Sequence, residues 1–184
     1  MKITRTRTAA AAALLAFAGS AAAAPAATAG AAAAPAAAAS PACTAASLST
    51  WVNADQASGA AGTIVYPLEF TNIGGHACTI RGYPGVSATS STGHQLGDAA
   101  ARQTLYPAAT VTVPAGGTVH ADLFYGDAEV STSGCKPEAA SLLKVYPPGQ
   151  KTARTAFFSL PACALTGHVY LRVSVVRPGA LLNG

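Results

Sequence analysis

Apolar and polar residues alternate with a period of two in several short segments of this chain, and Gly and Pro separate the segments. The pattern is clearest in residues 168–176, where Val169, Leu171, Val173 and Val175 should face the core, and His168, Tyr170, Arg172 and Ser174 should face solvent. Residues 118–125 repeat it, with Val119, Ala121, Leu123 and Tyr125 pointing inward and Thr118, His120, Asp122 and Phe124 pointing outward. Because side chains alternate across a strand, both segments are predicted to be half-buried antiparallel strands.

The same criteria predict strands at residues 46–52, 63–71, 76–81, 86–89, 110–113, 118–125, 141–146, 154–159 and 168–176. Pro67 argues against regular pairing in the second of them, since proline has no N–H to donate. Helix is scarce, although residues 98–104 are Ala-rich and Asp98 predicts a short helical turn there. The pattern therefore predicts an all-β fold, an immunoglobulin-like antiparallel β-sandwich.

Residues 72–84 combine a glycine-rich turn with a short β-branched strand, and the rest of the chain is expected to be organised around them. Gly74 and Gly75 are expected to supply positive φ angles for a tight reversal. Strand alternation should then bury Cys78. Pro84 should end the strand, because it lacks an N–H and holds the preceding residue extended.

Residues 1–24 have the layout of a cleavable signal peptide: three cations precede the apolar residues 9–18, and small residues follow. The apolar run is too short to span a bilayer, so we expect a secreted, extracellular chain with no stable membrane insertion after cleavage. Residues 25–42 are nearly all Ala, Pro, Gly, Ser and Thr and predict a disordered linker. The β-sandwich domain is expected at residues 43–178, followed by a tail at residues 179–184.

The charge of the chain lies largely in the expected signal peptide. The full sequence has eleven Lys and Arg against seven Asp and Glu, and removal of Lys2, Arg5 and Arg7 leaves eight cations and a net charge of about +1. The remaining cations are scattered, whereas nucleic-acid binding needs a contiguous positive surface. Nucleic acid is therefore not an expected partner.

Four cysteines, Cys43, Cys78, Cys135 and Cys163, predict two disulfides in an exported chain. Four cysteines allow three pairings. Sequential pairing, Cys43 with Cys78 and Cys135 with Cys163, is favoured because the first bond would fasten an N-terminal strand that otherwise frays. A zinc site is disfavoured, since no Cys-x-x-Cys pair occurs.

No catalytic motif occurs in the sequence, and we expect no enzyme activity and no cofactor. There is no Gly-x-Ser-x-Gly nucleophile turn, no phosphate-binding loop and no recognisable pair of catalytic carboxylates. His120 and Asp122 share one strand face, a spacing that could present two metal ligands. The other histidines, His76, His94 and His168, supply no identifiable third ligand, so both residues are expected to be ordinary solvent-facing side chains and no metal is predicted.

The aromatic residues offer a second candidate surface, a platform for a carbohydrate or a partner protein. These residues are Trp51, Tyr66, Tyr83, Tyr106, Tyr125, Tyr146 and Tyr170. Aromatics in small sandwiches are more often core or corner residues. Tyr83 and Tyr146 directly precede prolines at expected strand ends, so they are the ones expected to reach the surface, and Tyr83 is either a rigid binding anchor or a corner residue that caps the core.

The chain resembles the domain of unknown function 4232 family of secreted actinobacterial proteins over residues 42–178. The resemblance rests on the Cys-Thr-Ile-x-Gly-Tyr-Pro run at residues 78–84, the Pro-Ala-Gly-Gly turn at 114–117, the Tyr-Pro-Pro-Gly segment at 146–149, and the positions Asn72, Gly74, Val86, Cys43, Cys135, Pro137 and Cys163. It implies an extracellular β-sandwich with no established activity, and it supplies no catalytic residues.

Two functions fit these observations. The favoured one is a secreted non-catalytic domain that binds an extracellular protein or an envelope polymer as an accessory module. The alternative is a small disulfide-bonded protease inhibitor, in which residues 134–137 would form the inhibitory loop and Lys136 would enter a trypsin-like pocket. Pro137, which directly follows Lys136, weakens the alternative.

Overall fold

The computed structural model describes residues 39–130 and 134–179. The expected signal peptide at residues 1–24, most of the expected linker at 25–42 and residues 180–184 of the expected tail lie outside the described residues. The described chain is all-β with two disulfides. No helix in this part of the chain is long and apolar enough to cross a membrane.

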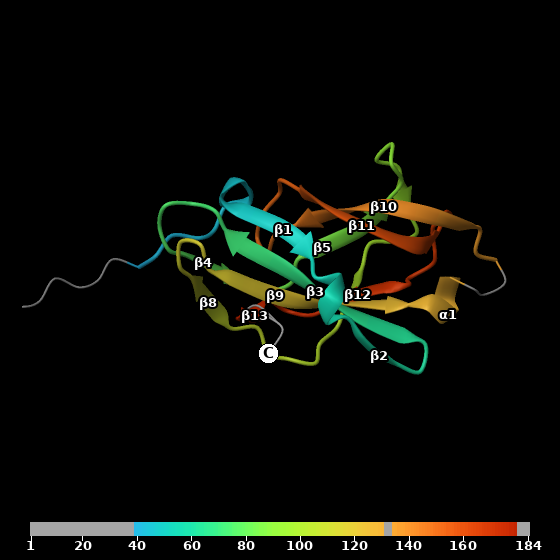
Figure 1. Cartoon of the computed structure of the whole chain (residues 1–184), viewed down its shortest axis with the longest axis horizontal. Helices are drawn as coiled ribbons and strands as arrows, with labels where there is room; N and C mark the ends of the chain where they lie inside the picture. Colours follow the sequence, from blue (N-terminus) through green and yellow to red (C-terminus); the bar gives the residue numbers. More distant parts are fainter. Residues whose placement is uncertain (1–38, 131–133, 180–184) are drawn as a thin grey trace, which may run out of the picture. The chain divides into compact units, whose positions relative to one another are not determined.

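The strands form three sheets, in which neighbours pair antiparallel apart from one short parallel pair (Figure 1). The seven-stranded sheet has the order β1 (Leu48–Val52), β3 (Thr63–Asn72), β9 (Thr118–Gly126), β12 (Leu171–Val173) and β7 (Ala101–Arg102), with β2 (Ser58–Ala60) beside β3 and β13 (Arg177–Pro178) beside β9. The four-stranded sheet has the order β11 (Arg154–Cys163), β10 (Pro137–Tyr146), β5 (Gly85–Thr89) and β6 (Gln95–Leu96). The third sheet pairs β4 (Cys78–Arg81) with β8 (Thr110–Val113), and the short helices are η1 (Ala45–Ser47), η2 (Ala54–Gln56) and α1 (Asp127–Val130).

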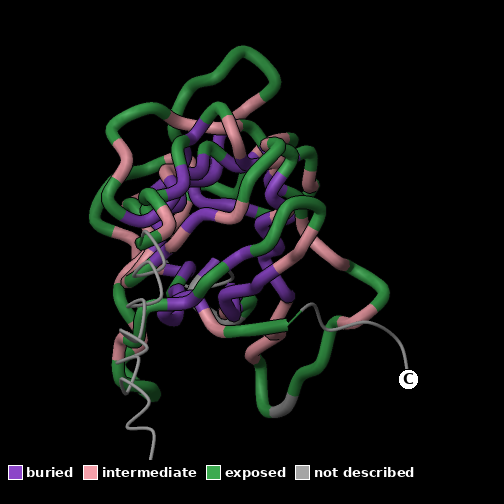
Figure 2. Tube along the Cα trace, turned by 90° about the vertical axis from the view of Figure 1, so that its left-hand side faces the viewer, coloured by how far each residue is buried: buried purple, intermediate pink, exposed green. Residues whose placement is uncertain are grey.

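One hydrophobic core joins the three sheets. Phe70 and Leu123 from the seven-stranded sheet, Leu143 from the four-stranded sheet and Val113 from the small sheet are all fully buried within it. Figure 2 shows the buried segments gathered in the interior, with exposed turns around them. Burial of a large aliphatic or aromatic side chain stabilises the fold by about 1.5–3 kcal/mol, so this shared core is the main reason the sheets stay together.

Both disulfides connect the cysteines in the order that the sequence favours, Cys43 with Cys78 and Cys135 with Cys163. The first bond is reinforced by backbone hydrogen bonds to Thr79, whose carbonyl accepts from the Cys43 N–H at 2.8 Å and whose N–H donates to the Pro41 carbonyl at 2.7 Å. Residues 41 and 42, which we expected to belong to the linker, are therefore attached to β4.

The turn in residues 72–84 differs from the prediction in its backbone. Neither Gly74 nor Gly75 has a positive φ angle, so the prediction of a left-handed reversal there is wrong. Gly74 instead packs closely, since a Cβ at this position would lie 3.1 Å from Asn72 Oδ1. The prediction that Cys78 is buried is confirmed.

The strand predicted at residues 168–176 is much shorter than expected, because only Leu171–Val173 forms β12. Tyr170 and Ser174, predicted to face solvent, are both buried. The Tyr170 hydroxyl donates to the Leu96 carbonyl at 2.7 Å, and the Ser174 hydroxyl accepts from the Asp122 N–H at 2.8 Å. These side-chain hydrogen bonds satisfy polar groups in the interior, where a regular half-exposed strand would have left them in water.

Two further predictions about secondary structure are wrong. Residues 98–104 do not form a helical turn; Ala101 and Arg102 form β7, which pairs parallel with β12. Pro67 does not disturb β3, which pairs with β9 in continuous register from Thr63 to Thr71. In a strand the N and C=O groups of one residue point to the same side, and the Pro67 carbonyl accepts from the Asn53 N–H, so the missing N–H lies on the side away from β9.

Candidate functional site

The outer face of β3 and β9 carries three buried polar side chains. Glu69, His120 and Asp122 are only 0%, 4% and 7% exposed, and Glu69 lies directly opposite His120 in the ladder. The prediction that His120 and Asp122 face solvent is therefore wrong. β13 pairs with β9 at this point, with Arg177 opposite His120, and the Arg177 side chain extends to Asp122.

Arg177 forms an ion pair with Asp122 that neutralises the buried carboxylate. Arg177 Nη2 lies 2.7 Å from Asp122 Oδ1 and 2.6 Å from Oδ2. The guanidinium also lies over the ring of Tyr106, with Cζ 4.2 Å from the ring centroid, which is cation–π geometry. The carboxylate is thus held in one orientation by a cation that is itself held by an aromatic ring.

His120 fastens the C-terminal segment to the sheet. Its Nδ1 lies 2.7 Å from the Gly179 carbonyl oxygen, and because a carbonyl can only accept, Nδ1 carries the proton and donates. The other ring nitrogen, Nε2, is 3.9 Å from Asp122 Oδ1, which is too long for a hydrogen bond. Nε2 has no hydrogen-bond partner among the described residues.

Beside the ion pair, the sheet surface is hollowed into a pocket of about 250 Å³, which we call the Asp122 pocket. Its lining residues come from η2, from the strands β2, β3 and β9, and from the loop after β7; they are Gln56, Ser58, Val65, Pro67, Leu105, Tyr106, Asp122 and Phe124. The walls are mainly apolar, and the Asp122 side chain, 10% exposed, is the only carboxylate among these residues. An apolar pocket with a few fixed polar groups is the usual form of a small-molecule site.

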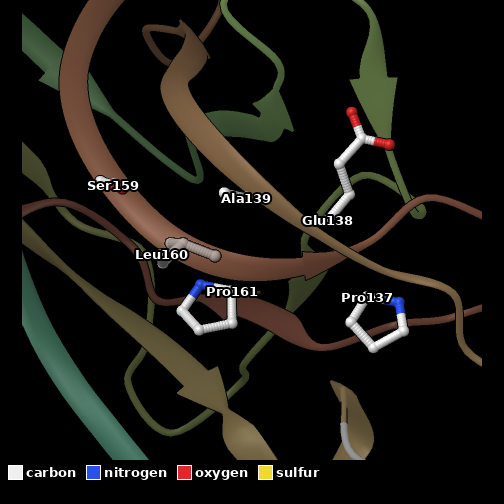
Figure 3. Close-up of a pocket in the computed structure, with 6 residues that line it drawn as sticks. All are labelled: Pro137, Glu138, Ala139, Ser159, Leu160 and Pro161. Carbon is white, nitrogen blue, oxygen red and sulfur yellow. The ribbon is translucent and has the colours of Figure 1, made fainter.

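A larger pocket of about 380 Å³ lies on the β10–β11 hairpin (Figure 3). It is lined by Pro137, Glu138, Ala139, Ser159, Leu160 and Pro161. Figure 3 shows the Glu138 carboxylate pointing away from Pro137 and Pro161, so charged and apolar groups do not converge on one point. Despite its smaller volume, the Asp122 pocket is the better candidate, since its carboxylate is buried and is held in place by Arg177.

The structure does not bring the histidines together. His76 and His94 lie exposed in separate turns, and His168 is half-buried near Gly134. Within the described ranges, no three His, Cys, Asp or Glu side chains gather closely enough to hold a metal ion.

Two tyrosines belong to the buried core. Tyr125 and Tyr170 are buried and their rings meet edge to face with centroids 6.4 Å apart. Burial, with a smaller contribution from Tyr125, raises the pKa of the Tyr170 hydroxyl well above its ordinary value. Burial also raises the pKa of Tyr125, and Asp127 and then Tyr66 add to that shift. These two hydroxyls stay protonated at neutral pH and serve packing.

Tyr83 is half-buried, and the Arg102 guanidinium lies 5.3 Å from its ring centroid. It is thus neither a fully displayed anchor nor a buried corner residue. Tyr146 is likewise half-buried, with Lys144 Nζ 5.4 Å from its ring centroid. The most exposed large apolar side chain among the described residues is Phe157 on β11, at 85%, and no pattern in the sequence indicates it.

Lys136, the candidate inhibitory residue, is exposed but does not lie at the tip of a projecting loop. Its carbonyl accepts from the Ala164 N–H at 2.8 Å, and Pro137 is paired with Cys163 at the start of β10. The Lys136–Pro137 bond is therefore part of a paired hairpin. Protease inhibitors need an accessible, extended loop, and no structural observation favours that function for this segment.

Substitutions at Asp122 and Arg177 should lower the free energy of unfolding non-additively, because the two side chains form an ion pair. We expect Arg177→Ala to lower the free energy of unfolding by about 2 kcal/mol, because a buried carboxylate loses its cation while Arg177 itself is partly exposed. The double change Asp122→Asn with Arg177→Ala should cost at least about 1 kcal/mol less than the sum of the single changes. Urea denaturation of the four proteins measures this difference, and strictly additive losses would contradict the pairing.

Comparison with known proteins gives one match. A family model described as a domain of unknown function, DUF4232, matches residues 43–177, from the first disulfide cysteine to Arg177. No curated protein and no solved structure matches the chain. The matched segment contains both disulfides and every residue of the Asp122 pocket.

Proposed function

The chain belongs to the family of domains of unknown function DUF4232, and from its site we propose that it is a non-catalytic binding domain whose ligand occupies the Asp122 pocket. The single observation that carries this proposal is the buried, Arg177-held carboxylate of Asp122 at the surface of an apolar pocket. Burying a carboxylate and its cation carries a desolvation cost, and a polar group already held in place can bind a ligand with little further ordering.

The chemistry of the pocket supports binding without catalysis. The Asp122 carboxylate is neutralised by Arg177, and His120 Nδ1 is committed to the Gly179 carbonyl. None of the described residues that line the pocket is a histidine or a cysteine, and the one carboxylate in the lining, Asp122, is paired with Arg177. A nucleophilic mechanism needs such a base within hydrogen-bond distance, so we expect no turnover.

The proposed setting is extracellular. Two disulfides support an oxidising, non-cytoplasmic compartment, and the signal peptide expected at residues 1–24 would direct the chain there. In that setting the domain would act as an accessory module that binds an envelope polymer or an extracellular protein. We also propose that its frame is an immunoglobulin-like sandwich, which the core shared by the two larger sheets supports.

A fragment screen by NMR tests the binding proposal. The folded domain, labelled with ¹⁵N, is mixed with a library of neutral, cationic and anionic small molecules, and amide shifts are mapped onto the fold. We expect saturable shifts to cluster at Ser58, Asp122 and Phe124, with no matching cluster at the β10–β11 pocket. If no fragment perturbs the Asp122 pocket, the proposed function is wrong.

A further inference from the structure

We infer that the ligand of the Asp122 pocket is a neutral saccharide unit, bound by hydroxyl groups that donate to the Asp122 carboxylate. This inference rests on the proposed function and adds the chemical class of the ligand. It follows from the charge of the pocket, from its remaining hydrogen-bonding capacity and from the shape of its walls.

The charge of the pocket disfavours ions of either sign. An anion would meet the Asp122 carboxylate, the one acidic side chain in the lining. A cationic ligand would have to compete with Arg177, which already contacts both carboxylate oxygens of Asp122 and lies over the Tyr106 ring. The ion pair leaves the pocket close to neutral, and a neutral ligand has the smallest desolvation cost there.

Hydrogen-bonding groups in the pocket match hydroxyls. Each carboxylate oxygen has two lone pairs and accepts one close contact from Arg177 Nη2, so acceptor capacity remains on Asp122. His120 does not donate a hydrogen bond to this carboxylate, since its Nε2 is 3.9 Å from Asp122 Oδ1. Gln56 and Ser58, which line the same pocket, can each donate and accept. A ligand with adjacent hydroxyls can donate to the carboxylate and exchange hydrogen bonds with the other two.

The walls match the apolar face of a sugar ring. Pro67 and Phe124, which both line the pocket, come from the adjacent strands β3 and β9. Their flat or broad apolar surfaces suit the C–H face of a pyranose. The volume of about 250 Å³ is below the range of about 300–1,000 Å³ that holds drug-sized ligands, so it suits a single ring.

The position of Asp122 is fixed before any ligand binds. Its N–H donates to the Ser174 hydroxyl at 2.8 Å and its carbonyl accepts from the Ser174 N–H at 2.9 Å, while Arg177 holds the carboxylate. Side chains on a rigid sheet lose little conformational entropy on binding. Such preorganisation favours recognition of a small ligand that offers few contacts.

The test is an NMR titration of the folded domain with a panel of monosaccharides and disaccharides containing glucose, galactose, mannose and N-acetylglucosamine. The matched control ligand is cyclohexanol, which has a six-membered ring with one hydroxyl; tetramethylammonium and acetate are the ionic controls. We expect at least one saccharide to give saturable shifts at Ser58, Asp122 and Phe124, and the three controls to bind at least about tenfold more weakly.

Substitutions inside and outside the Asp122 pocket test whether the saccharide binds there. Ser58→Ala, at an exposed position that should not affect folding, is expected to weaken binding about three- to tenfold through one lost hydrogen bond. Asp122→Asn should weaken it at least about tenfold, and Phe157→Ala, on the other large sheet, should leave it unchanged. Unchanged binding in both Ser58→Ala and Asp122→Asn overturns the inference.

The outcomes separate the inference from the function on which it rests. If fragments perturb the Asp122 pocket but no saccharide does, or if cyclohexanol binds as tightly as the saccharides, the binding function holds and the saccharide inference is wrong. If neither fragments nor saccharides perturb the pocket, both proposals are wrong.

Discussion

Replacing Asn72 by alanine is expected to lower the free energy of unfolding by about 4 kcal/mol. Asn72 is fully buried, and its amide makes three hydrogen bonds. Nδ2 donates to the carbonyls of His76 at 2.9 Å and Val113 at 3.0 Å, and Oδ1 accepts from the Gly74 N–H at 2.9 Å. Alanine would leave these three backbone groups without the amide. The hydrogen bond to Val113 is buried, and an unsatisfied buried group costs about 1–3 kcal/mol, while the two partly buried groups at His76 and Gly74 add smaller losses.

Urea denaturation of purified, oxidised protein measures the effect. Ile73→Ala, at the adjacent exposed position, is the matched control and should cost less than about 1 kcal/mol. Asn72→Asp should also be strongly destabilising, because a carboxylate would face two carbonyl oxygens in place of the amide donors. A loss below about 1 kcal/mol for Asn72→Ala would show that the amide does not hold this corner together.

Replacing Gly97 by alanine is expected to cost about 3–4 kcal/mol. Gly97 has a φ of +66°, and a Cβ there would lie 2.4 Å from Cε1 of Tyr170. Tyr170 cannot move aside freely, because its ring is buried and its hydroxyl donates a hydrogen bond to the Leu96 carbonyl. The substitution therefore combines the cost of a left-handed backbone, about 1–2 kcal/mol, with overpacking of about 1–3 kcal/mol.

Gly93→Ala provides a control with the same backbone requirement and no steric conflict. Gly93 has a φ of +83°, and a methyl group at its Cβ position would have no neighbouring heavy atom within 4 Å. This variant should lose only the backbone contribution, about 1–2 kcal/mol. Thermal and urea unfolding of the two variants give the comparison. Equal losses of unfolding free energy would mean that the Tyr170 ring moves aside for the methyl group without an energetic cost.

The inner faces of the strands could be predicted from the sequence, because each depends only on alternation within one segment. Val119, Ala121, Leu123 and Tyr125 are buried as predicted. The burial of His120 and Asp122 could not be predicted in this way. It depends on Arg177 and Gly179, more than fifty residues away, and the two-residue strand β13 has no periodicity to reveal it.

Other failures also arose from long-range contacts. Residues 168–176 have strand alternation, but only Leu171–Val173 forms a strand, and the side chains of Tyr170 and Ser174 make buried hydrogen bonds to distant residues instead of facing solvent. β7 forms because β12 lies beside it, although its local sequence favours a helical turn. The Asp122 pocket draws on residues from 56 to 124, so no local motif in the sequence could have identified it.

The Cys43–Cys78 bond also determines how the domain would respond to mechanical force. A pull on the chain N-terminal to Cys43 passes through the sulfur atoms to β4 and bypasses residues 44–77, which include β1 and β3. The 35-position separation corresponds to about 120 Å of extended chain that tension cannot release while the bond is intact. If residues 25–42 tether the domain to a surface, the inner strand β3 stays mechanically shielded under load.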